Sequence, residues 1–202
     1  MRRRIATAIA TLCSLALVVP AAGCGGGGSV TNLVATGSVT CSTLTGVASF
    51  SPPLTLTGSA PETTTISLNA GGCTVSNSNA GGVSGGRATV TNNTATSNCT
   101  SLLTSRPVKV AVEWTPTTLH PSAVSFSGYA PSKSSAGAGS GFVFPDPGGK
   151  ASATGSFAGD DGGKSTTVSA FTTEGESQLL GACGSPAGLT SIAISSGTFK
   201  VG

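Results

Sequence analysis

The chain has 202 residues, of which only 8% are charged and 4% are aromatic, and its formal net charge is +3. The excess positive charge is Arg2, Arg3 and Arg4 at the start of the chain, because the other seven bases balance the seven acids. Without that leader the surface has no net charge, which argues against nucleic acid or an anionic lipid surface as a partner. The roughly 180 residues that follow the leader suffice for one domain with a sizeable core.

Residues 1–23 have the pattern of a secretory signal peptide. Three arginines are followed by an apolar run over residues 5–19 and then by small residues. This order is typical of an export signal, and the apolar run is too short to span a bilayer in a mature protein. We therefore expect the mature protein outside the cytoplasm.

Cys24 follows small residues and precedes a Gly-rich run. This arrangement resembles a bacterial lipobox, which predicts a lipid anchor on Cys24 and a flexible tether over residues 24–32. Lipoboxes usually carry leucine where this chain has Ala21, and cleavage after Ala21 or Ala22 would instead release the protein. Two localisations therefore stay open: a lipid-anchored protein on the outer face of the cell envelope, and a secreted protein.

The chain contains six cysteines, one of them within the signal peptide. If Cys24 carries lipid, an even set is left, Cys41, Cys73, Cys99 and Cys183, which can form two disulfides in three pairings. We favour Cys41–Cys73, joining early strands, and Cys99–Cys183, joining two short helical segments. No two of these cysteines have the spacing of zinc ligands, so no metal site is expected.

Residues 33–202 are predicted to form a single all-β domain. Short runs of alternating apolar and polar residues are separated by Gly, Pro, Asn and Asp clusters, which is typical of an antiparallel β-sandwich, immunoglobulin-like or of a related two-sheet kind. About nine to ten strands are expected: 33–41, 47–51, 63–68, 87–94, 108–115, 123–129, 141–144, 151–157, 165–171, and 191–194 continuing towards Val201.

The strand over 108–115 has the clearest alternation, because its valines and Trp114 share one face and Lys109 and Glu113 share the other. The first face is predicted to be buried, which makes Trp114 a core residue rather than a platform for a sugar, and the second is predicted to face solvent. Two short helical turns are expected over 99–104 and 174–183, the second placing Leu179 and Leu180 in the core. Pro52 and Pro53 should end the second strand. Turns over 146–149 and 160–163 should join neighbouring antiparallel strands.

No group of residues predicts a catalytic, cofactor or metal site. Residues 82–86 fit the nucleophile pattern G-x-S-x-G around Ser84, but they lie in a Gly-rich loop that no helix follows. His120 is the only histidine, and nothing in the sequence around it suggests a catalytic partner. Asp160 and Asp161 could bind calcium, although Asp-Gly pairs are also common in turns. Tyr129 follows a glycine near a strand end, where an exposed ring could stack on a sugar.

Several short motifs resemble those of a group of small exported actinobacterial proteins. They are Thr40-Cys41-Ser42, residues 50–54, Gly72-Cys73, residues 99–103, residues 155–159 and residues 180–186. The resemblance extends from about Cys41 to Val201. It implies export and a cysteine-bridged β fold, and it implies no particular activity.

The sequence therefore favours a non-enzymatic module with a structural or binding role in the cell envelope, with an unidentified envelope or extracellular partner and no cofactor. One alternative is an extracellular hydrolase whose acids meet only in the fold, or in which Ser84 lies beside His120. The other is a carrier of a small apolar ligand. A carrier predicts an open pocket lined by residues such as Phe142, Phe144 and Trp114, whereas a packed core would exclude it.

Overall fold

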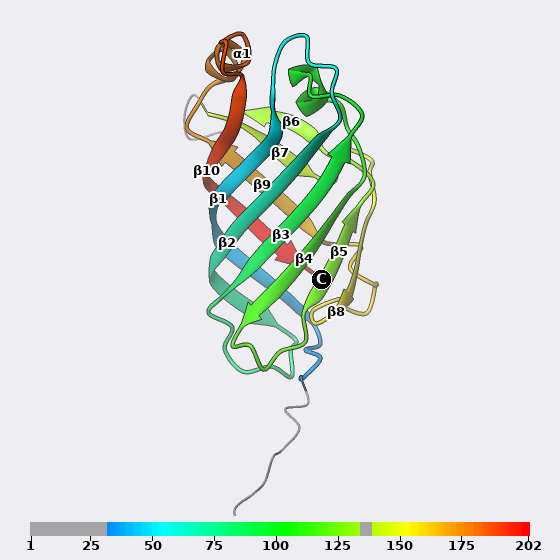
Figure 1. Cartoon of the computed structure of the whole chain (residues 1–202). Coiled ribbons are helices and arrows are strands. Elements are labelled where there is room, and N and C mark those ends of the chain that lie inside the picture. Colours follow the sequence, from blue (N-terminus) through cyan, green and yellow to red (C-terminus); the bar gives the residue numbers. More distant parts are fainter. Residues whose placement is uncertain (1–31, 134–138) are drawn as a thin grey trace, which may run out of the picture. The chain divides into compact units, whose positions relative to one another are not determined.

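The computed structural model describes residues 32–133 and 139–202. The predicted signal peptide, Cys24 and nearly all of the predicted tether lie outside these ranges. The described residues form ten strands and two short helices (Figure 1). The strands are β1 (Ser38–Leu54), β2 (Glu62–Ser76), β3 (Gly85–Thr94), β4 (Val108–Thr115), β5 (Ser122–Phe126), β6 (Ala130–Lys133), β7 (Ser140–Phe144), β8 (Ala151–Gly155), β9 (Thr167–Thr172) and β10 (Leu189–Val201), and the helices are the 3-10 helix η1 (Cys99–Leu103) and α1 (Glu176–Cys183).

All ten strands belong to one sheet, in the order β6-β7-β9-β10-β1-β2-β3-β4-β5-β8. Every neighbouring pair within it is antiparallel. The prediction of an all-β antiparallel protein with about ten strands is therefore confirmed. The prediction of two separate sheets is not confirmed, because the strand order is continuous.

The sheet curls so that one half of it lies over the other. Figure 1 shows β9 and the end of β10 passing behind β2, β3 and β4. Ring contacts join the two halves: Phe126 of β5 lies 5.5 Å from Phe144 of β7, and Trp114 of β4 lies 6.2 Å from Phe199 of β10, measured between ring centroids. The apolar face of the sheet is thereby enclosed within the fold.

The turns over 146–149 and 160–163 do not join neighbouring strands, so that prediction is wrong. The first connects β7 to β8 and the second connects β8 to β9, yet β8 pairs only with β5. The physical reason is the curling of the sheet, which brings its two outer ends together. A short turn can then pass from one end of the strand order to the other.

Alternation along the strands determines which side chains enter the core. In β4 every second residue is buried, Val108, Val110, Val112 and Trp114, and the residues between them are exposed. The predicted bounds and the predicted buried face of this strand are both confirmed. Trp114 also contacts the edge of Phe157, with ring centroids 5.1 Å apart.

The two predicted strands over 33–41 and 47–51 correspond to one long strand, β1, which begins at Ser38 rather than at Leu33. Contrary to prediction, β1 also continues through Pro52 and Pro53 to Leu54. Pairing with β2 ends at Ser51, and the register with β10 shifts between Ser49 and Leu54. The prolines therefore occupy positions where no regular ladder bond needs their missing N–H groups.

The two predicted helical segments correspond to η1 and α1. Leu179 packs against the core, but Leu180 is 42% exposed, so its predicted burial is wrong. Adjacent residues on a helix point in different directions, and α1 presents only one side to the sheet. Strand β6 was not expected, because it is short and contains Pro131, which restricts it to the edge of the sheet.

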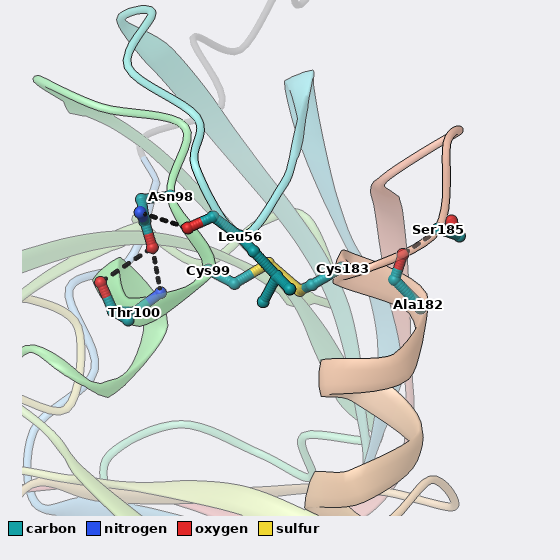
Figure 2. Close-up of a disulfide and its surroundings, with 7 residues drawn as sticks. All are labelled: Leu56, Asn98, Cys99, Thr100, Ala182, Cys183 and Ser185. Atoms are coloured by element: carbon teal, nitrogen blue, oxygen red, sulfur yellow. Dashed lines mark hydrogen bonds between the residues drawn. A yellow bond between two sulfur atoms is a disulfide. The ribbon is translucent and has the colours of Figure 1, made fainter.

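The described residues contain two disulfides, Cys41–Cys73 and Cys99–Cys183, the pairing that the sequence favours. The first joins directly paired residues of β1 and β2. The second joins the start of η1 to the end of α1, as Figure 2 shows. Disulfides persist in oxidising compartments, so they indicate a location outside the cytoplasm. Neither helix of the described ranges is long and apolar enough to cross a membrane.

Candidate ligand-binding cavity

An apolar cavity of about 100 Å³ lies inside the curled sheet. Aliphatic side chains of β1 to β4 and aromatic rings of β5, β7 and β10 line it. The principal residues are the aliphatic Leu44, Leu68, Val90 and Val110 and the aromatic Phe126, Phe142, Phe144 and Phe199. Protein interiors contain few voids larger than a water molecule, so a void of this size is a candidate binding site.

Of the three residues predicted to line a carrier pocket, Phe142 and Phe144 do so. Trp114 lies behind Phe199, on which it stacks, and is only 2% exposed. The interpretation of Trp114 as a core residue is therefore confirmed. The stacked pair backs the cavity wall, while the cavity itself extends between the phenylalanines.

Polar side chains line the cavity at one end of the sheet. They are Thr64 near the start of β2, Asn92 near the end of β3, Arg106 just before β4, and Tyr129 just before β6. This is the end of the sheet that carries η1, since η1 and Arg106 both belong to the connection between β3 and β4. The cavity is thus apolar along its length and polar at this end only.

Arg106 and Tyr129 are the most distinctive of these residues. The Nε atom of Arg106 is buried, with no hydrogen-bond partner among the described residues. Tyr129 is 5% exposed, and its hydroxyl donates to the carbonyl oxygen of Ser101 over 3.3 Å. Burial raises the pKa of Tyr129 above its ordinary value of 10.0, and the positive charge of Arg106 partly opposes this rise. Because the ring is buried, Tyr129 does not provide the exposed sugar platform considered from the sequence.

Glu62 is a buried carboxylate at the same end of β2, with 2% of its surface exposed. Its Oε1 accepts a hydrogen bond from the hydroxyl of Thr64 over 2.9 Å, and its Oε2 accepts one from the hydroxyl of Thr94 over 3.0 Å. Sequence reasoning overlooked both Glu62 and Arg106. Glu62 could have been predicted to be buried, because it shares the alternation of Thr64, Leu68 and Ala70, which form the buried face of β2. Arg106 lies in the connection between η1 and β4, where no alternation indicates which side chains are buried.

A second hollow of about 250 Å³ adjoins the first, between η1, α1 and the β6–β7 pair. Leu102 and Phe142 line both spaces. The Cys99–Cys183 disulfide also borders the second hollow, so η1 and α1 are covalently joined beside it. Disulfide and helices together form a braced cap next to the polar end of the cavity.

Asn98 secures this cap to the loop between β1 and β2, as Figure 2 shows. Its side-chain amide donates to the carbonyl oxygen of Leu56 over 2.8 Å. Its side-chain oxygen accepts from the backbone N–H and the hydroxyl of Thr100, each over 2.9 Å. The cap is therefore held by hydrogen bonds as well as by the disulfide.

Ser84 and His120, considered from the sequence as a nucleophile and a base, are both exposed. The backbone N–H of Ser84 donates to the carbonyl oxygen of Thr115, and Nδ1 of His120 lies 2.8 Å from the carbonyl oxygen of Pro121. Within the part of the chain that the structure describes, no hydrogen bond joins Ser84 to His120. Their placement gives the hydrolase hypothesis no support.

Asp161 organises its own turn. Its carboxylate accepts hydrogen bonds from the Ser165 hydroxyl and from the backbone N–H groups of Gly163 and Lys164, which lower the pKa of the carboxyl. The carboxylate of Asp161 is therefore held by hydrogen-bond donors of its own turn. In residues 32–133 and 139–202, no three His, Cys, Asp or Glu side chains are grouped so that they could hold a metal ion.

No protein family, curated protein or solved structure matches this chain. The cavity and the residues around it therefore provide the argument for function.

Proposed function

We propose that this protein is an exported, non-enzymatic binding module of the cell envelope that holds a small apolar molecule inside its curled sheet. The observation that carries the proposal is the cavity of about 100 Å³ lined by phenylalanine and aliphatic side chains. A protein cavity of about 150 Å³ lined by apolar side chains stays dry and binds benzene. The present cavity accordingly suits one ring or a short alkyl segment, and the remainder of a larger ligand would extend past Leu102 and Phe142 into the adjoining hollow of about 250 Å³.

Filling the cavity should abolish binding. Ala170, on β9, is a buried wall residue, and in the variant Ala170→Phe an added ring would occupy the space that a ligand needs. We expect the wild-type domain to bind a naphthylamine dye that fluoresces in apolar surroundings, and the variant to bind it at least about tenfold more weakly, a loss of about 1.4 kcal/mol. Fluorescence titration of the disulfide-intact protein measures this difference.

The matched control is Ala193→Phe, which adds the same ring to an exposed position of β10 and should leave dye affinity unchanged. Ala48→Leu, at another wall position, provides a smaller filling substitution if Ala170→Phe does not fold. A wild-type domain that binds no dye, or folded cavity variants with undiminished affinity, would contradict the proposal.

We further propose that Cys24 carries the lipid that attaches this module to the envelope, with the Gly-rich segment as its tether. The intact mass of the protein from its native host should exceed that of the chain beginning at Cys24 by a diacylglycerol group. Reduction should then add the mass of two hydrogen atoms for each of the two disulfides. An unmodified chain beginning upstream or downstream of Cys24 would show that the protein is released instead.

A further inference from the structure

Arg106 is the only charged side chain among the described residues of the cavity wall. Its Nε–H is buried without an acceptor in the described part of the protein. A buried donor without a partner is costly, and a guanidinium group can only donate hydrogen bonds. The wall of an otherwise apolar cavity thus contains a cation whose hydrogen bonding is incomplete.

Two carboxylates lie near this end of the cavity, Glu62 and Asp146, and neither supplies the missing acceptor among the described residues. Asp146 accepts from the hydroxyl of Ser105 through Oδ2, and its Oδ1 is buried without a partner. The two carboxylate oxygens of Glu62 accept hydrogen bonds from the hydroxyls of Thr64 and Thr94.

Asn92, which shares the wall with Arg106, carries an amide N–H that can donate to a ligand, whereas the hydroxyl of Tyr129 already donates to the carbonyl oxygen of Ser101. The polar end of the cavity therefore offers donors around one positive charge.

We propose that the bound molecule is an anionic amphiphile whose acidic head pairs with Arg106, while its alkyl or aryl part lies among Phe126, Phe142 and Phe144. A guanidinium group matches the geometry of carboxylate and phosphate oxygens and forms two parallel hydrogen bonds with them. Pairing would satisfy the buried Nε–H, and the phenylalanines would shield the remainder of the ligand from water. This inference rests on the proposed function, because it requires the cavity to hold a ligand.

The test uses four ligands with the same eight-carbon chain: octanoate, octyl phosphate, octanol and octylamine, each below its critical micelle concentration. We expect the two anions to displace the dye with an affinity about tenfold or more above that of octanol, because charge-assisted hydrogen bonds are the stronger ones. Octylamine should bind most weakly. Comparison of octanoate with octyl phosphate also distinguishes a carboxylate head group from a phosphate head group.

Arg106→Gln should remove the preference for anions while leaving the affinity for octanol nearly unchanged. Arg87→Gln is the matched control, because it removes the same charge from the exposed outer side of β3 and should retain the preference. Arg106→Lys keeps the charge without the planar guanidinium, so it should show an intermediate preference and also serves if Arg106→Gln does not fold.

Tyr129, the only tyrosine of the chain, provides a readout that is independent of affinity. A bound anion would cancel the influence of Arg106 that lowers the pKa of Tyr129. Octanoate should therefore raise this pKa further, and by more than octanol does, in an absorbance titration of tyrosinate.

Equal binding of octanoate and octanol, or a preference for anions that survives in Arg106→Gln, would overturn the inference and leave the proposed function standing. Preferential binding of octylamine would also overturn it. A failure of all four ligands and of the dye would instead contradict the proposed function itself.

Discussion

Replacing Trp114 with alanine should lower the free energy of unfolding by about 3–5 kcal/mol, the range typical of large aromatic side chains removed from a core. Trp114 is 2% exposed and lies between the edge contact with Phe157 and the stacked ring of Phe199. Its indole N–H donates to the hydroxyl of Ser122 over 2.8 Å. The backbone of Gly86 lies so close to the indole that a β-carbon there would approach it to 2.9 Å, so the surroundings have little freedom to fill the space.

Urea unfolding followed by far-ultraviolet circular dichroism measures this loss, since the variant lacks the only tryptophan of the chain. Trp114→Phe retains a ring but not the hydrogen bond, and it should cost less, about 1–2 kcal/mol. Val47→Ala, at a side chain that is 44% exposed, should change stability by no more than about 0.5 kcal/mol. A loss below about 1 kcal/mol for Trp114→Ala would contradict the central role of this ring.

Removal of the Cys99–Cys183 disulfide by a double serine substitution should lower the free energy of unfolding by about 2–5 kcal/mol. The disulfide joins positions separated by 84 residues, compared with 32 for Cys41–Cys73. If the stabilisation comes from restricting the unfolded chain, the longer loop contributes about 0.9 kcal/mol more than the shorter one. Loss of the Cys99–Cys183 disulfide would also remove the covalent link between η1 and α1, and η1 contributes Leu102 to the cavity wall.

Denaturant unfolding of this variant and of the matched double serine variant at Cys41 and Cys73 tests the expectation. The first variant should be the less stable of the two, and it alone should bind the apolar dye less tightly. Residues 41 and 73 are held together by the long ladder between β1 and β2, and neither cysteine lines the cavity. If dye affinity fell equally in both variants, the disulfide would have no specific role in bracing the cap.

Local features of this protein were well predicted from sequence. The alternation in residues 108–115 gave both the bounds of β4 and its buried face, because side chains of a strand point alternately to its two sides. The two helical segments corresponded to η1 and α1, although Leu180 was wrongly expected in the core. The favoured cysteine pairing also agrees with the disulfides that the structure contains.

The sequence by itself therefore determined the all-β class, the buried face of the clearest strand and the oxidising environment. Only the tertiary structure decided the strand order, the curling of the sheet and the cavity. Alternation of apolar and polar residues shows which side of a strand is buried, but it does not show which strand lies beside it. The turns between β7 and β8 and between β8 and β9 therefore could not be distinguished from hairpin turns. A cavity depends on the space left between side chains that are distant in sequence. For the same reason, only the fold shows that Arg106, an isolated residue in a connection, lines the same cavity as the phenylalanines.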